Sequence, residues 1–174
     1  MTTPLPPIWF LDVDGVVNAL RPRTGLLSTK ASTAGRVWPI HWSPEVVRVI
    51  NTCHATGLAE VRWLTTWEQD AHLSLAPAVG LDAFVAYDIP AETGRHGWWK
   101  ADVVAEVIAA EERPFVWTDD DLAAEDVEGL VADLGVDHLL VAPTPEHGLR
   151  SSELRDVIDF LSQFAVGRPS GGAS

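Results

Sequence analysis

Five short apolar segments alternate along the chain with segments of helical periodicity, and this alternation restricts the possible folds more than any other feature. The predicted strands are Ile8–Val13, Glu60–Thr65, Ala83–Tyr87, Pro114–Thr118 and His138–Ala142. Strands that alternate with helices form a parallel sheet with helices on both faces. We therefore predict an α/β fold, a three-layer Rossmann-like sandwich around a central parallel sheet of about five strands.

The predicted helices fill the intervals between these strands. They are Pro44 to about Gly57, a short helix after Trp67, and the segments Trp98–Ala110, Leu122–Leu134 and Ser151–Phe164. Ser43 followed by Pro44 is a typical helix start, because serine caps the first turn and proline fits the first helical position. We expect Asp121, and Ser151 or Ser152, to cap the last two helices.

One segment, Gly15 to His41, does not follow the alternation. We expect a long loop or a β-hairpin flap here, and loops of this length inside a compact domain are usually functional or mobile. It is too short for a folded cap domain. We predict a single domain over residues 1–166, with the flap inserted at about 15–41. Residues 167–174 are rich in glycine and serine, which predicts a flexible C-terminal tail.

Composition and charge limit the class of protein. The sequence has 174 residues, 47% of them hydrophobic, with no secretion signal and no apolar stretch near the ~20 residues that span a membrane. Cys53 is the only cysteine, so we expect a core residue on a helix, no disulfide and a cytoplasmic location. The formal net charge of −13 makes duplex nucleic acid an unlikely partner. A small anionic substrate stays possible where a divalent cation reverses the local charge.

Acids, hydroxyls and one lysine follow the predicted strands at the points where the strands end. They are Asp12 and Asp14 after the first strand, Thr65 and Thr66 at the second, Asp119 to Asp121 after the fourth, and Lys100 in the first turn of a helix. The carboxyl ends of parallel strands meet at one edge of the sheet, where ligands bind. Residues two apart on a strand share a face, so Asp12 and Asp14 can converge, and Gly15 allows a sharp turn.

Lys100 is informative because lysine is rare in this chain, which has ten arginines and only two lysines. A lysine is a compact point charge and differs from the planar guanidinium of arginine. In the first helical turn, this cation meets the unfavourable end of the helix dipole. Nearby anions would compensate that penalty.

The ordered set of motifs resembles the haloacid dehalogenase superfamily of phosphohydrolases. DVDGVV, which starts at Asp12, looks like its first motif, and VRWLT, which ends at Thr65, looks like its second. WWKADVV, around Lys100, and FVWTDD, which ends at Asp120, look like the third and fourth. The resemblance covers nearly the whole chain and is to small bacterial members without a large cap domain.

The resemblance implies a Mg²⁺-dependent phosphatase that acts on a small phosphorylated substrate. Asp12 would be the nucleophile that forms an aspartyl phosphate, and Asp14 the general acid and base. Thr65, Thr66 and Lys100 would bind the phosphoryl group, and Lys100 would also hold the nucleophile. Asp12, Asp119, Asp120 and the backbone carbonyl of Asp14 would hold Mg²⁺, an ion that prefers oxygen ligands. Dehalogenating members lack an acid at the position of Asp14, so phosphate chemistry is preferred.

Two other classes of function stay open on the sequence. One is a nucleotide or polynucleotide-end phosphatase in nucleic-acid repair, whose flap cations Arg21, Arg23, Lys30 and Arg36 contact the substrate. The other is a non-catalytic binding domain. Seven of the eight tryptophans fall into two groups, of which Trp9, Trp63 and Trp117 are predicted core residues. Trp38, Trp42, Trp67 and Trp98 either form a stacking wall at the site or pack the flap and helices.

Overall fold

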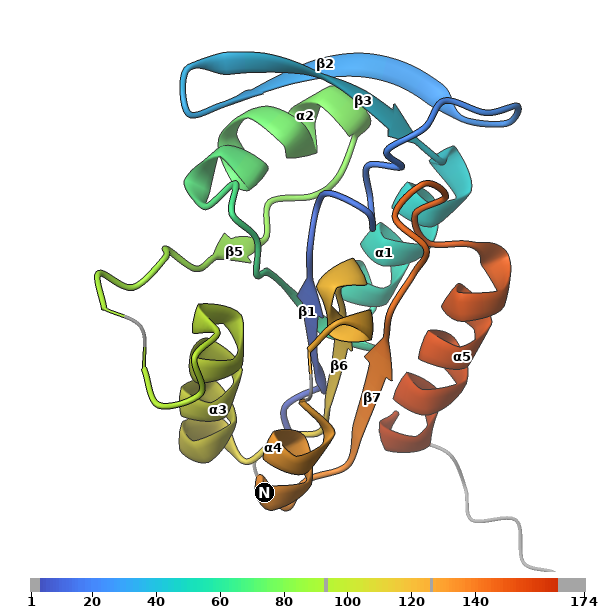
Figure 1. The fold of residues 1–174 in the computed structure, drawn as a ribbon. Helices are drawn as coiled ribbons and strands as arrows, with labels where there is room; N and C mark the ends of the chain where they lie inside the picture. Colours follow the sequence, from blue (N-terminus) through green and yellow to red (C-terminus); the bar gives the residue numbers. More distant parts are fainter. Residues whose placement is uncertain (1–3, 93, 126, 166–174) are drawn as a thin grey trace, which may run out of the picture.

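A computed structural model describes residues 4–92, 94–125 and 127–165 and shows an α/β fold around a five-stranded parallel sheet (Figure 1). The strand order is β5-β4-β1-β6-β7. The strands are β1 (Ile8–Leu11), β4 (Glu60–Trp63), β5 (Val85–Ala86), β6 (Phe115–Thr118) and β7 (His138–Val141). The predicted fold class, a Rossmann-like three-layer sandwich, is confirmed.

Among the described residues, the remaining elements are five α-helices, three short helices of other types and a two-stranded antiparallel sheet. The α-helices are α1 (Pro44–Ala55), α2 (Ala76–Val79), α3 (Trp99–Glu111), α4 (Glu128–Asp133) and α5 (Ser151–Leu161). The π-helix η1 (Ala71–Leu75) precedes α2, and the 3-10 helices are η2 (Asp120–Ala123) and η3 (Ser162–Phe164). Strands β2 (Leu27–Thr33) and β3 (Arg36–Trp42) form the small sheet.

Strand β1 lies at the centre of the large sheet and is buried on both faces. Ile8 pairs with Glu60 of β4 on one side and with Phe115 of β6 on the other, as predicted. Successive side chains point to opposite faces. Trp9 and Leu11 therefore join the core beneath α1 and α5, whereas Ile8 and Phe10 join the core beneath α3 and α4 (Figure 1).

The sequence allowed either a long loop or a β-hairpin between Gly15 and His41, and the structure shows the hairpin. Strands β2 and β3 pair antiparallel along their full length, and the hairpin packs on η1 and α2 (Figure 1). Ala31 and Ile40 are buried and anchor its inner face to the core. The hairpin therefore lies close to the carboxyl edge of the large sheet, with one face turned toward the domain.

Three local predictions are wrong. The predicted helix Leu122–Leu134 is divided into η2 and α4, and this break lets Leu122, Val127 and Val131 reach the same core cluster. Asp119, not Asp121, caps η2, because the Asp119 carboxylate accepts a hydrogen bond from the Asp121 backbone N–H at 3.1 Å.

The third wrong prediction concerns the start of α5. Its N-cap residue is Arg150 instead of Ser151 or Ser152, and the Glu153 carboxylate accepts a 2.8 Å hydrogen bond from the Arg150 backbone N–H. Glu153 lies in the first turn, so its negative charge also suits the helix dipole.

Core predictions for the aromatic and thiol side chains hold. Trp9, Trp63 and Trp117 are fully buried, and Cys53 is buried on α1. Within the described residues, none of the helices combines the length and apolar character needed to cross a membrane. The predicted tail, 167–174, lies outside the described residues.

Candidate active site

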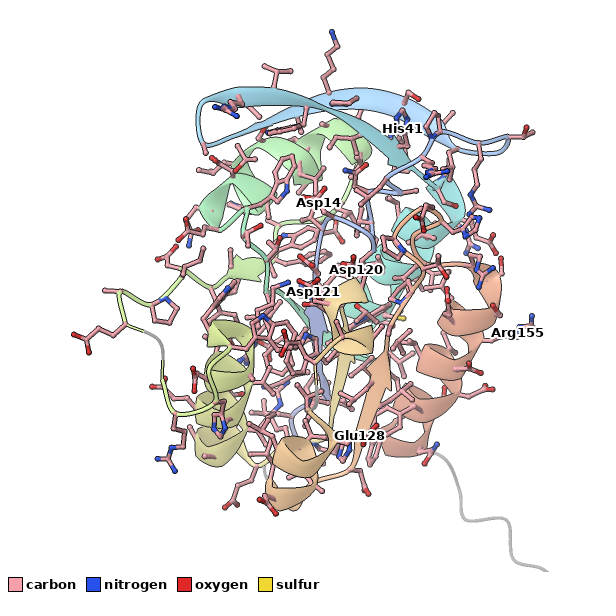
Figure 2. All side chains as sticks on the ribbon, viewed as in Figure 1. Asp14, His41, Asp120, Asp121, Glu128 and Arg155 are labelled. Atoms are coloured by element: carbon pink, nitrogen blue, oxygen red, sulfur yellow. The ribbon has the colours of Figure 1, made fainter. Side chains whose placement is uncertain are left out.

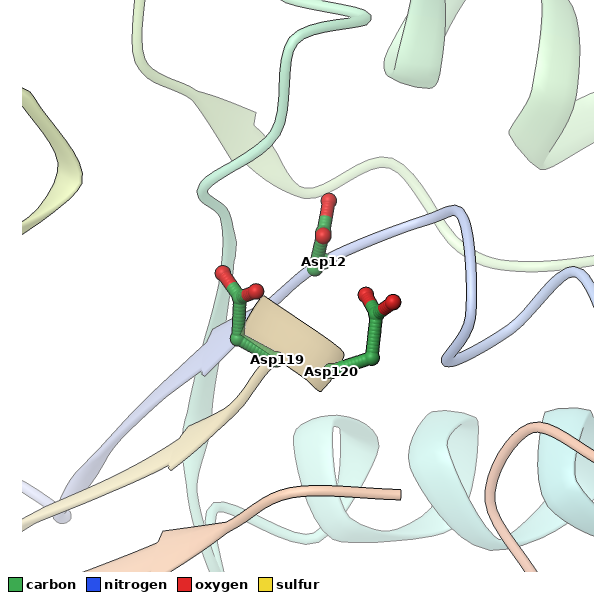
Figure 3. Close-up of side chains that lie close together, drawn as sticks. All are labelled: Asp12, Asp119 and Asp120. Carbon is green, nitrogen blue, oxygen red and sulfur yellow. The ribbon is translucent and has the colours of Figure 1, made fainter. Parts of the chain in front are cut away.

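Three aspartates from two strand ends converge at the carboxyl edge of the sheet (Figure 3). Asp12 follows β1, Asp119 follows β6, and Asp120 is the first residue of η2. One carboxylate oxygen from each lies within 4.8 Å of the other two, which is close enough for a shared cation. Asp12 and Asp119 are buried and Asp120 is partly exposed. Since β1 and β6 are paired neighbours, the sheet itself sets this arrangement.

Lys100 lies beside two of these acids, at the start of α3. Its Nζ donates to Asp12 Oδ2 at 2.9 Å and to Asp119 Oδ2 at 2.7 Å, and the side chain is buried. Burial opposes the charged form, but the two carboxylates outweigh it and raise the pKa of the Lys100 ammonium. These anions also compensate the cation for its position in the first turn of a helix.

The cluster has an excess of negative charge. Among the described residues, Lys100 is the only cation that forms an ion pair with these carboxylates, so two negative charges are unbalanced when all three carboxylates are ionised. The network toward the other edge of the sheet is different. There, Arg62 and Arg113 pair with Glu60 and Glu111 at 2.6–2.8 Å, and the charges balance. The carboxyl edge is therefore the place where an added cation is favourable.

Burial shifts the acids of the cluster toward their protonated forms. It raises the pKa of Asp12, against the opposing effect of Lys100 and of hydrogen bonds from Thr65 and the Val13 backbone. Burial and the charge of Asp12 raise the pKa of Asp119 to about 7 and that of Asp120 to about 6. A bound divalent cation would favour all three ionised forms instead.

Gly15 makes room for the Asp120 carboxylate. Its φ of +72° lies in the left-handed region, and a Cβ atom at this position would overlap the Asp120 carboxylate group. The glycine thus serves both the turn after Asp14 and the close approach of a site residue. The donor set and this cradle fit a small cation held by oxygen atoms.

Asp14 lies apart from the three-aspartate cluster, beneath the hairpin (Figure 2). Its Oδ1 accepts a hydrogen bond from the Asn18 amide at 2.7 Å, and its Oδ2 accepts one from Trp67 Nε1 at 2.8 Å. Asn18 is buried and also accepts from the His41 backbone N–H at 2.9 Å. Asn18 therefore connects Asp14 to the hairpin.

Neither of these two partners of Asp14 was assigned that role from the sequence. Asn18 falls four residues after Asp14 in an irregular turn, which has no periodic signal. Trp67 is distant in the sequence, and we considered it there only as a wall or packing residue.

The two threonines after β4 have different surroundings. Thr65 is buried and its hydroxyl favours the ionised form of Asp12, whereas Thr66 is exposed and lines a cavity of about 790 Å³. Asp14 lines the same cavity, which extends beneath the hairpin. The structure thus brings together Asp12, Thr65, Lys100, Asp119 and Asp120, and places Asp14 and Thr66 in the wall of the adjoining cavity.

Comparisons of the chain with protein-family models, with curated proteins and with solved structures found no match. The site is therefore interpreted from its own geometry.

We predict that Mg²⁺ stabilises the protein more at about pH 8 than at about pH 5. Because the pKa values of Asp119 and Asp120 are raised in the folded state, their contribution to stability is present in acid. It is lost as the pH rises through about 6 and about 7. If Mg²⁺ occupies the cluster, it would bind the ionised carboxylates and offset this loss, so we expect its effect to increase with pH.

Thermal unfolding with and without Mg²⁺ at the two pH values measures this effect. Sodium chloride at matched ionic strength is the control for screening. A Mg²⁺-induced shift in Tm of the same size at both pH values would contradict the prediction.

Proposed function

We propose that the protein is a Mg²⁺-dependent phosphohydrolase of the haloacid dehalogenase type, with Asp12 as the nucleophile. The observation that supports this most directly is the buried Lys100 ammonium, which bridges Asp12 and Asp119 within a cluster of three carboxylates. A lysine in this position neutralises part of the repulsion between a carboxylate nucleophile and an anionic phosphoryl group. The adjoining cavity, with Asp14 in its wall, supplies space for the leaving group.

Mg²⁺ fits the donor set of this site. Carboxylate oxygens from Asp12, Asp119 and Asp120 would hold it, and the backbone carbonyl of Asp14 is a further oxygen donor by the family resemblance. Mg²⁺ prefers such hard oxygen ligands and usually keeps waters or substrate phosphate in its remaining positions. When bound, the ion supplies charge stabilisation to the phosphoryl group.

In the first step, an Asp12 carboxylate oxygen attacks phosphorus and the bond from phosphorus to the leaving oxygen breaks. Asp12 Oδ1 accepts from the Val13 backbone N–H at 2.7 Å and Oδ2 accepts from Lys100, so the carboxylate is held in one orientation. Each oxygen has a second lone pair for attack. Asp14 gives a proton to the leaving oxygen, as general acid.

In the second step, water attacks the phosphorus of the aspartyl phosphate. Asp14, now ionised, takes a proton from that water, and the bond between phosphorus and Asp12 breaks to release inorganic phosphate. Lys100 and the Thr65 hydroxyl donate hydrogen bonds at the reacting carboxylate, and Lys100 offsets negative charge as it builds up.

A small substrate is favoured over a polymer by the positions of the flap cations. Lys30 pairs with Pro39 on the outer face of the hairpin, opposite the face that carries buried Ala31 and Ile40. Arg23 donates to the His147 backbone carbonyl at 3.2 Å. Of the four flap cations, Arg36 is the one that lines the cavity.

The proposed function is tested by the release of inorganic phosphate from an activated aryl phosphate. We expect hydrolysis with Mg²⁺ and none after chelation, with recovery when excess Mg²⁺ is restored. Asp120→Asn should raise the Mg²⁺ concentration needed for half-maximal rate, because one ligand charge is lost. Equal rates with Mg²⁺ and with chelator would exclude the proposed mechanism.

A further inference from the structure

The cavity beside Asp14 has the size and position of a binding site for the part of the substrate that leaves. Its volume of about 790 Å³ lies within the range typical of small-molecule sites. It opens between the hairpin and the turn after β1, so a ligand inside it lies next to the Asp14 carboxylate.

Side chains from both faces of the hairpin border this cavity, and the strand pairing identifies those that lie on the anchored inner face. Residues that lie opposite one another in an antiparallel pair share a face, and each strand alternates between faces. Buried Ala31 pairs with Trp38, and Thr33 pairs with Arg36. Trp38, Thr33 and Arg36 are thus on the inward face, and all three line the cavity.

Trp38 is unusual for an inward-facing residue, because 44% of its surface is exposed. A large indole on the anchored face of a hairpin would ordinarily be covered by the core beneath it. Here the cavity lies beneath it instead, so the indole has a free surface toward a ligand. Trp67 also lines the cavity, and its N–H already donates a hydrogen bond to Asp14.

The chemistry of this wall suits a flat aromatic group better than a polyhydroxylated one. Several adjacent hydroxyls of a sugar would each need a polar partner when buried. The inward face of the hairpin offers an indole, a guanidinium and one hydroxyl, from Trp38, Arg36 and Thr33, and Thr66 adds a second hydroxyl. The other polar side chains of the lining already hydrogen-bond within the protein; they are Asp14, Asn18 and His41. Indole stacks on heteroaromatic rings, and a guanidinium donates to ring nitrogen or carbonyl acceptors.

We propose that this cavity is the leaving-group site and that it selects phosphomonoesters of aromatic, nucleoside-like alcohols, with Trp38 as the specificity-determining residue. This inference rests on the proposed function. Trp38 stacks on the aromatic ring, and Arg36 donates to its acceptor atoms. The leaving oxygen is then next to Asp14.

The test compares kcat/KM for adenosine monophosphate with kcat/KM for glycerol phosphate in the Mg²⁺-loaded protein. We expect the wild type to prefer adenosine monophosphate, and Trp38→Ala to lower this preference by roughly ten- to a hundred-fold, the typical worth of one base-stacking contact. Trp38→Phe should keep most of the preference. Val37→Ala is the matched control, because Val37 is exposed on the outer face of the same strand and should leave the preference unchanged.

A binding measurement separates this inference from the proposed function. Calorimetry with adenosine monophosphate and the Asp12→Asn protein should give binding that weakens when Trp38→Ala is added. Hydrolysis that depends on Asp12 but keeps its substrate preference in Trp38→Ala would overturn the inference alone. Trp38-dependent binding with no hydrolysis by the wild type would overturn the proposed function and keep the cavity as a site for aromatic ligands.

Discussion

Asp12→Asn is expected to abolish phosphate release while leaving the fold intact. An amide nitrogen or oxygen cannot replace the carboxylate as nucleophile, so the aspartyl phosphate does not form. Loss of a nucleophile that acts together with other groups typically lowers kcat on the order of 10⁴-fold or more. The measurement is the initial rate of aryl phosphate hydrolysis at saturating Mg²⁺.

Stability should respond to Asp12→Asn in the opposite direction from activity. Burial raises the pKa of Asp12, so its charged form costs stability at neutral pH. A neutral amide of nearly the same shape removes that cost, and Lys100 keeps its 2.7 Å ion pair with Asp119. We expect Tm without Mg²⁺ to be unchanged or higher. An unfolded variant would be uninformative about the nucleophile, so Tm is measured with each rate.

Asp14→Asn gives a second comparison in the same assay. It removes proton transfer to the leaving oxygen, which is typically worth about 10²–10⁴-fold. The loss should be smaller for an aryl phosphate, whose leaving group needs little protonation, than for an alkyl phosphate. Wild-type rates in Asp12→Asn would end the proposed mechanism, whatever the result at Asp14.

The arrangement of the large sheet could be predicted because burial on both faces leaves a strong signal. Strand β1 is apolar throughout and β6 nearly so, whereas β4 alternates apolar Val61 and Trp63 with charged Glu60 and Arg62. The bounds of strand β5 were harder to predict from the sequence. The predicted strand Ala83–Tyr87 is reduced to Val85–Ala86, because an edge strand has a single neighbour and pairs here only with Arg62 and Trp63.

The convergence of Asp12, Lys100, Asp119 and Asp120 followed from topology, because β1 and β6 end at one edge and α3 begins there. The contacts of Asp14 could not be predicted from the topology. Its partners come from a turn and from a residue 53 positions away, and neither contact has a sequence period. Likewise, the residue that caps η2 could not be predicted among Asp119, Asp120 and Asp121, because all three are aspartates.

Gly15→Ala should disable the cation site, although it changes no ligand. The new methyl group would overlap the Asp120 carboxylate, and the backbone φ of +72° adds strain for any residue with a Cβ atom. Relief of the overlap moves Asp120 away from Asp12 and Asp119. We expect the Mg²⁺-induced rise in Tm to be lost and phosphate release to fall on the order of a hundred-fold or more, the scale of disrupted catalytic positioning.

Gly35→Ala is the matched control, because Gly35 has the same φ of +72° and no atoms within 4 Å of an added Cβ. Both variants carry the strain of a left-handed alanine, about 1–2 kcal/mol, but only Gly15→Ala meets Asp120. Gly35→Ala should therefore lower Tm and keep its response to Mg²⁺. If Gly15→Ala does not fold, Asp120→Asn, which removes the same ligand without strain, tests the site in its place. An undiminished Mg²⁺ response in a folded Gly15→Ala protein would show that Asp120 is not needed to hold the cation.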